Sequence, residues 1–294
     1  MLSSHAPHAY WLGRHWRRLL LNVTASDHAI SDALNGGDAW RSVLNLTDSR
    51  EAFVQLQTLP DITHLTQWMT HAKAHSGSAV EVLQALRENI RVLRAVLPNS
   101  FWHYVERSQV SLHALRHNPD PTHADSLAPL RSALQLTRSM MYALCGDLYC
   151  HVRRDGLYEL IQVGAQLEHM DSVLRLSRLY LEGLMPAEFI LPCSGWMPQG
   201  TDANLVLNDN TQHASQTLWQ LLIHDDTLPI SLRASLNGMI SALQDFDLGS
   251  ASGVVDELQA MLKLAPTESP STAWIMGVQG RVTLLHYRLE QALF

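Results

Sequence analysis

Three arginines form the group of side chains best suited to bind an anion, and one glutamate lies beside them. Arg87, Arg91 and Arg94 are spaced by four and three residues, so on a helix they share one flank. Guanidinium groups in a row can hold a carboxylate or a phosphate through bidentate hydrogen bonds. Glu88 lies beside them and is the candidate general acid or base. The alternative is a salt-bridge ladder, exposed or between helices, in which Glu88 pairs with Arg91.

A second set of charged residues is divided between two distant segments. Arg14 and Arg18 lie one helical turn apart near the N-terminus. In the middle of the chain, helical spacings of three and four residues relate Glu168, Asp171 and Arg175. Buried charges are tolerated when they are paired. We therefore expect a buried charge network in which Arg14 or Arg18 faces Glu168, with Asp171 nearby.

Metal and nucleophile chemistry has weaker support. His71 and His75 have the spacing of metal ligands on a helix, but neither an HExxH motif nor a carboxylate-rich partner accompanies them. The odd set of Cys145, Cys150 and Cys193 is expected to be buried free thiols in a reducing compartment. Cys193 could be a nucleophile only beside a histidine that no motif specifies. No phosphate-binding glycine loop is present, and we predict neither a metal nor a cofactor.

Trp196 and Met197 form an apolar pair in a segment rich in proline and glycine. The other tryptophans fall mostly on predicted helices, where core packing explains them. An apolar pair in an irregular loop is instead suited to docking a partner protein. We therefore predict a partner-binding point at Trp196 and Met197.

Helical periodicity is the dominant pattern that would position these side chains. Apolar residues recur every three or four positions in 10–23, 83–97, 158–180 and 274–293, and Pro98 is expected to end the second of these helices. No segment reads as a convincing strand. The only β-like stretch, 189–191, opens the longest predicted loop, 186–211. The fold class is therefore all-α, a bundle of about ten helices.

The chain reads as one domain, 1–294, built from two similar halves at about 1–120 and 121–294. Aligning Gly13 with Gly164 places Ser78 and Ser231 at comparable distances of 65 and 67 residues. This ordered self-similarity is typical of a duplicated helical unit. The alternative is chance similarity between amphipathic helices.

Composition narrows the classes of function. Hydrophobic residues make up 46% and charged residues 17%, which favours a large core or a surface covered by a partner. The net charge of −7 argues against general affinity for nucleic acid. The N-terminus has no signal-peptide pattern and no run is long enough to span a membrane, so we expect a cytoplasmic protein.

Three segments in order resemble motifs of the alpha-E family, a bacterial all-helical family with a recurring Glu-Arg motif. Tyr10 to Arg18 reads YWLGRHWRR and resembles the family's YWLGRxxER opening. The segment 86–94 reads LRENIRVLR and is similar to the ARENARxxR core. The segment 160–171 reads LIQVGAQLEHMD and is similar to a later LGRxxERAD copy. The three span nearly the whole chain, and only the middle copy is intact: Arg17 stands at a glutamate position, and Ala165 and His169 at arginine positions.

The resemblance implies an accessory role beside ATP-grasp amide ligases, transglutaminase-like proteins and related peptide-modifying enzymes. It implies no catalytic residue. The first hypothesis is therefore a non-catalytic scaffold that binds an ATP-grasp-type ligase or its peptide substrate. The second is an enzyme acting on amide bonds, with Glu88 as acid or base and Arg87 and Arg91 holding a carboxylate. The third is a binding module for an anionic small ligand.

Overall fold

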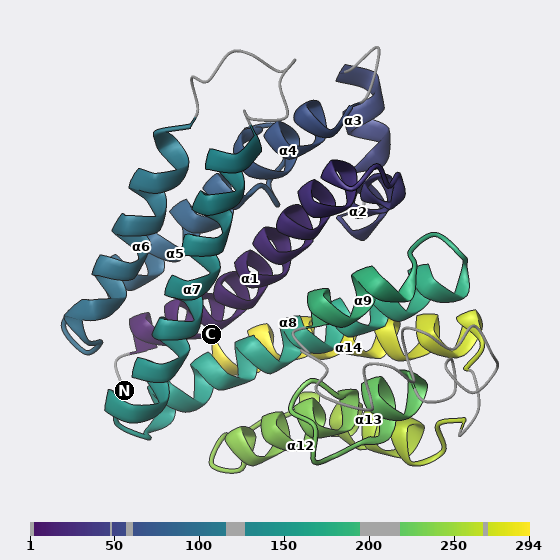
Figure 1. Ribbon diagram of the computed structural model, residues 1–294. Helices are drawn as coiled ribbons and strands as arrows, with labels where there is room; N and C mark the ends of the chain where they lie inside the picture. Colours follow the sequence, from purple (N-terminus) through teal and green to yellow (C-terminus); the bar gives the residue numbers. More distant parts are fainter. Residues whose placement is uncertain (1–2, 48, 57–60, 116–126, 195–217, 267–269) are drawn as a thin grey trace. The chain divides into compact units, whose positions relative to one another are not determined.

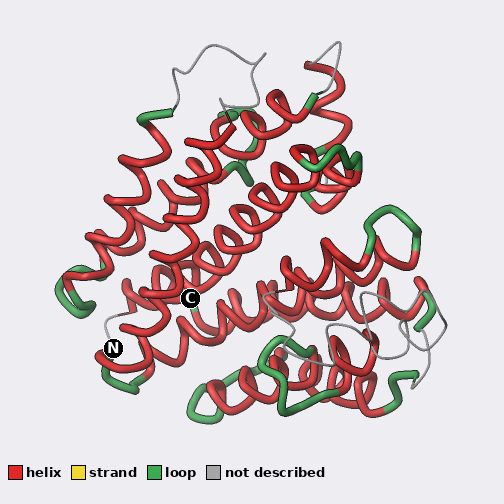
Figure 2. The backbone as a smooth tube through the Cα atoms, viewed as in Figure 1, coloured by secondary structure: helices red, strands yellow, loops and turns green. Residues whose placement is uncertain are grey.

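The described part of the chain is helical and contains no strand. A computed structural model describes residues 3–47, 49–56, 61–115, 127–194, 218–266 and 270–294. Figure 2 shows helices joined by turns throughout these ranges, which confirms the all-α prediction. None of the described helices combines the length and the apolar character needed to cross a membrane.

The chain divides into two compact units that share one helix. The α7 unit contains residues 15–154, and the α8 unit contains residues 1–14 and 155–294. Helix α1 (Ala6–Leu34) follows a short 3-10 turn, η1 (Ser3–His5), and belongs to both units. The unit boundaries differ from those of the proposed halves, and the duplication of the chain stays a prediction.

In the α7 unit, α1 is followed by η2 (Ala39–Ser42), α2 (Val43–Leu46), α3 (Arg50–Leu56), α4 (Ile62–His71), α5 (Ala79–Val92), α6 (Asn99–His113) and α7 (Leu127–His151) (Figure 1). Helix α5 packs on α4 and α6, and α6 packs on α7. The helix expected over 83–97 ends earlier, at Val92. Leu93 and Leu97 nevertheless remain buried, because a turn closed by Leu97 N donating to Leu93 O keeps them on the core side.

The α8 unit is organised around α8 (Gly156–Leu181), which packs against α9 (Ala187–Ser194), α12 (Leu232–Leu243) and α14 (Thr272–Leu293). The unit is completed by the π-helical turn η4 (Gln220–His224) and by α13 (Ala251–Lys263), which packs on α14. Buried residues occur on all sides of α8, as expected for a helix enclosed by others. Asp155 caps its N-terminus by accepting hydrogen bonds from Leu157 N and Tyr158 N.

One element contradicts the sequence prediction. The segment 189–191 is neither β-like nor part of a loop, because it lies inside α9, with Pro192 in the last turns of the same helix. Phe189, Ile190 and Leu191 are all buried, so core packing offsets the backbone hydrogen bond that proline cannot donate. Trp196 and Met197 lie outside the described residues.

Candidate functional site: the charge network of the family motif

The crossing of α1 and α8 brings two motif glycines into backbone contact within the α8 unit. A Cβ atom on Gly13 would lie 2.0 Å from the carbonyl oxygen of Ile161 and 2.7 Å from the nitrogen of Ala165. A Cβ atom on Gly164 would lie 2.0 Å from the carbonyl oxygen of Tyr10. Only glycine permits so close a backbone approach, and this explains why both motif copies carry it.

Next to this crossing, the guanidinium group of Arg14 pairs with the carboxylate of Glu168. Arg14 Nε donates to Glu168 Oε2 at 2.6 Å, and the two side chains are 9% and 3% exposed. This is one of the two pairings expected from the sequence. Burial alone would lower the pKa of Arg14, but Glu168 and Tyr10 hold it above its ordinary value. Arg14 therefore keeps its charge in the core, and the adjacent carboxylate of Glu168 compensates its loss of water.

Tyr10 extends the network to the C-terminal helix. Arg14 Nη1 donates to the Tyr10 hydroxyl at 3.2 Å, and the hydroxyl lies 2.7 Å from His286 Nδ1. Because the guanidinium can only donate, the hydroxyl is free to donate to His286, whose ring stacks on Tyr10 at 5.9 Å. Burial raises the pKa of Tyr10 to about 12, with Arg14 opposing the shift, so this hydroxyl keeps its proton. The network thus joins α8, α1 and α14.

Asp171 makes a second connection to α14. Its carboxylate pairs with Arg175 on the same helix and accepts a hydrogen bond from Gln279 Nε2 at 3.3 Å. Asp171 therefore links α8 to α14 directly, whereas Glu168 is connected to α14 only through Arg14 and Tyr10. Arg18, the other candidate on α1, lies half-buried in the α7 unit.

The arginine stripe of α5 is arranged largely as a salt-bridge ladder. Arg91 Nε donates to Glu88 Oε2 at 2.7 Å, with side chains 61% and 48% exposed. Arg87 Nε donates across to Glu106 of α6 at 2.8 Å. Two of the three arginines and the candidate acid or base are thus used in pairs, as in the alternative interpretation of the sequence.

Arg94 is arranged differently from the other two. Its guanidinium carbon lies 5.3 Å from the ring centre of Trp102, which Arg87 also approaches, at 4.6 Å. Among the residues that the structure describes, no carboxylate pairs with Arg94. The aromatic contact holds its exposed guanidinium in place, with its donors available to an anion.

Sequence reasoning missed a buried acid with three polar partners. Asp27 of α1 accepts hydrogen bonds from Arg131 Nε at 2.9 Å, Gln135 Nε2 at 3.1 Å and Arg138 Nη1 at 3.3 Å. All three donors come from α7, and their spacing of four and three residues was the available signal. The cluster anchors α7 on α1 inside the α7 unit.

The histidines and cysteines have separate environments. His71 Nε2 lies 2.9 Å from Leu112 O, whereas the His75 ring stacks on Trp68 at 5.3 Å. Across the described ranges, no three His, Cys, Asp or Glu side chains gather in a way that would hold a metal ion. The expectation that the thiols are buried is wrong for Cys150, which is exposed, and Cys145 is half-buried. Cys193 lies in α9 and not in a loop, and burial raises its pKa to about 12.

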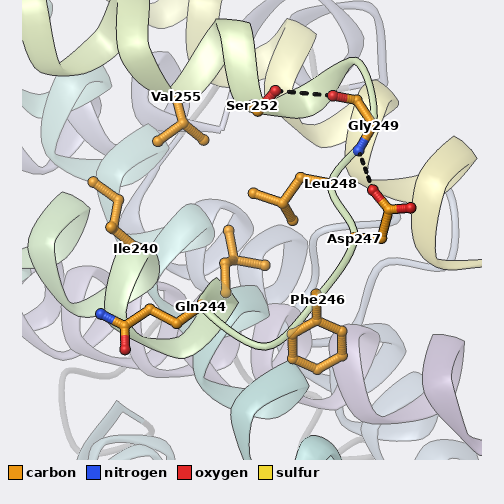
Figure 3. A pocket seen from close by; sticks show the side chains of 9 residues that line it. Ile240, Gln244, Phe246, Asp247, Leu248, Gly249, Ser252 and Val255 are labelled. Carbon is orange, nitrogen blue, oxygen red and sulfur yellow. Dashed lines mark hydrogen bonds between the residues drawn. The ribbon is translucent and has the colours of Figure 1, made fainter.

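A pocket of about 400 Å³ opens where α12 leads into α13 (Figure 3). Its wall is mainly apolar, and no predicted site residue lines it. Its polar groups serve the turn itself: Gly249 N donates to Asp247 Oδ1 at 3.1 Å, and Ser252 Oγ donates to Gly249 O at 2.9 Å. The pocket therefore offers mainly shape and apolar surface.

The comparisons with known proteins agree with the motifs. No curated protein and no solved structure matches the chain. The Alpha-E family model, described as a predicted alpha-helical domain with a conserved ER motif, matches residues 1–294. The buried Arg14–Glu168 pair lies on two of the segments that carry this resemblance. The chain belongs to the Alpha-E family.

Proposed function

We propose that this protein is a non-catalytic accessory or scaffold protein that acts in the cytoplasm with an ATP-grasp-type amide ligase in the modification of peptides or small metabolites. The observation that carries the proposal is the use of the motif charges. Arg14 and Glu168 neutralise each other in the core, where substrate has no access to either. The class of partner is the one that the resemblance to the Alpha-E family implies.

Glu88 provides further support. A general acid or base is usually held in a partly desolvated site that tunes its pKa toward the working pH. Glu88 is instead half-exposed on α5 and pairs with an arginine one turn away on the same helix. This environment suits a surface ion pair and favours the scaffold over the amide-bond enzyme.

We also propose that the chain arose by duplication, with the α1 and α8 motifs as equivalent copies. The contacts at the crossing support this. Gly13 lies against Ile161 and Ala165, which are three residues before and one residue after Gly164. Gly164 lies against Tyr10 and Arg14, which have the same positions relative to Gly13. Such reciprocity is what a local two-fold axis between two copies would produce.

The test is co-purification of the tagged protein from its native cell, followed by reconstitution with the ligase recovered. A stoichiometric ATP-grasp ligase in the eluate, bound equally well by the Glu88→Gln variant, is the expected result. If the protein alone turned over an amide substrate and Glu88→Gln abolished that turnover, the enzyme hypothesis would replace the scaffold. Circular dichroism of the variant controls for its folding.

A second candidate, binding of an anionic small ligand, is supported by Arg94 alone. Its guanidinium is held against Trp102 and has no carboxylate partner among the described residues. A thermal shift with small carboxylates or phosphates that disappears in Arg94→Gln would favour this role. The matched variant Arg91→Gln, which removes a guanidinium already paired with Glu88, should keep the shift.

A further inference from the structure

The pocket between α12 and α13 has an apolar wall that the chain itself covers only in part. The apolar lining comes from both helices and from the turn that joins them: Ile240, Leu243, Phe246, Leu248 and Val255 (Figure 3). Leu243 and Val255 are buried at its base, whereas Ile240, Phe246 and Leu248 are half-buried. At about 400 Å³ the pocket is near the lower end of the range found for binding sites, so it suits one or two large apolar side chains.

The turn that carries part of this wall is held in place by its own hydrogen bonds. Phe246 N donates to Leu243 O at 3.1 Å, and Ala251 N donates to Leu248 O at 2.8 Å. These bonds add to the two at Gly249, whose φ of 47° lets the chain reverse between the helices. The wall is therefore formed before anything binds, which lowers the entropic cost of filling the pocket.

The chain around the pocket is acidic and has no basic residue. Between Arg233 and Lys263 it contains four carboxylates and no Lys, Arg or His. One of the four, Glu257, pairs with Arg281 of α14 at 2.7 Å. The other three are exposed, and within the described ranges no cationic side chain pairs with them: Asp245, Asp247 and Asp256.

Each of these three carboxylates adjoins the pocket. Asp247 lines it, and Asp245 directly precedes Phe246, which also lines it. Asp256 lies one helical turn after the lining residue Ser252, on the same side of α13. The α8 unit as a whole has 16 acidic and 7 basic residues, against 12 and 14 in the α7 unit, so its field attracts cationic partners.

We propose that this pocket binds a basic segment of a partner protein. A large apolar side chain of the segment fills the pocket, and Lys or Arg residues on either side of it face Asp245, Asp247 and Asp256. Charge complementarity identifies the occupant, because an acidic segment would be repelled and a purely apolar one would leave the carboxylates unused.

The placement of the carboxylates favours a peptide segment over a small cation. They lie on two elements, the turn and α13, and a small amine brings a single charge to one of them. A chain that continues past the pocket on both sides can reach more of them while its apolar side chain stays anchored. The inference goes beyond the function proposed above, since it holds for any protein that carries such a segment.

The test is binding of short synthetic peptides to the full chain, measured by fluorescence anisotropy. One set carries a central Leu, Phe or Trp between lysines, and the matched set carries glutamates in place of the lysines. We expect the best lysine peptide to bind with a Kd of roughly 100 µM or lower, and every glutamate peptide to bind at least about tenfold more weakly. Added salt should weaken binding of the lysine peptide, because the carboxylates are exposed.

Variants separate the charges from the apolar contact. Asp247→Asn combined with Asp256→Asn should weaken the lysine peptide about three- to tenfold. Tm should stay unchanged, since the asparagine oxygen can still accept from Gly249 N. Phe246→Ala should weaken binding at least about fivefold, with circular dichroism as the control for folding. The matched control is Asp226→Asn, which removes another exposed carboxylate at the far end of α12 and should leave binding unchanged.

Several outcomes overturn the proposal. Lysine and glutamate peptides that bind alike would do so, as would the absence of any binding. Binding that is indifferent to both the double variant and Phe246→Ala would place the peptide elsewhere on the chain. If phenethylamine bound as tightly as the best lysine peptide, the occupant would be a small cation and not a partner segment. Because the peptides are synthetic, a negative result leaves the proposed partnership with a ligase untouched.

Discussion

Replacing Glu168 by glutamine should destabilise the α8 unit strongly, because it leaves the Arg14 charge buried without its counter-ion. The two side chains are 9% and 3% exposed, so water cannot take the place of the carboxylate. Breaking a buried pair by removing one partner costs about 3–5 kcal/mol. For a unit of about 150 residues, each kcal/mol lowers Tm by about 2–4 °C, which predicts a loss of roughly 6–20 °C.

The measurement is thermal unfolding followed by circular dichroism at neutral pH. Two variants serve as controls. Glu88→Gln breaks an exposed pair and should cost only about 0.5 kcal/mol. The double variant Arg14→Met with Glu168→Leu removes both charges and should recover much of the loss, because no unpaired ion remains. A Glu168→Gln variant that melts within about 2 °C of wild type would refute the view that the motif charges stabilise this crossing.

Three further predictions follow from backbone contact, protonation and thiol burial. Gly164→Ala should lower Tm by many degrees, since its Cβ would lie 2.0 Å from a carbonyl oxygen, whereas Gly280→Ala, with nothing within 4 Å, should raise Tm slightly. His75 has a pKa lowered by burial, so the unfolded chain binds its proton more readily. The stability that neutral His75 contributes is present above pH 6.5 and is lost as the pH falls through the lower pKa of the folded state. The decrease in Tm from pH 8 to pH 5.5 should therefore be smaller in His75→Phe than in wild type. At pH 8, the exposed Cys150 should react quickly with a thiol reagent, whereas the buried Cys193, whose pKa is about 12, should react only after unfolding. Mass spectrometry of the labelled peptides measures both reactions, and an early reaction at Cys193 would contradict the prediction.

Much of the fold was predictable, because helical periodicity is a local property. The long helices α1, α8 and α14 correspond to predicted segments, and α14 begins two residues before the predicted start. The error at α9 arose from local signals that disagreed. Pro192 indicated a loop, while the buried side chains of 189–191 gain enough from packing to keep the helix.

The charge pairs were predictable only where a motif related the two segments. Glu168 was expected opposite Arg14 or Arg18 because these positions belong to copies of one motif. The pairing of Asp27 with Arg131 joins residues 104 apart in the sequence, and no motif connects them. Glu106 was missed as the partner of Arg87 for the same reason, since the packing of α6 on α5 decides which acid lies within reach.

The division of α1 between the two units has a consequence for the order in which the protein forms during synthesis. The α7 unit is a continuous stretch, 15–154, and its residues leave the ribosome together. The α8 unit instead needs the first fourteen residues of the chain and its last helix. Tyr10 contacts His286 and Phe294, more than 270 residues later in the sequence, so the first turns of α1 lack these partners until α14 has been synthesised. Deleting residues 1–14 or deleting α14 therefore removes one side of the same helix contact.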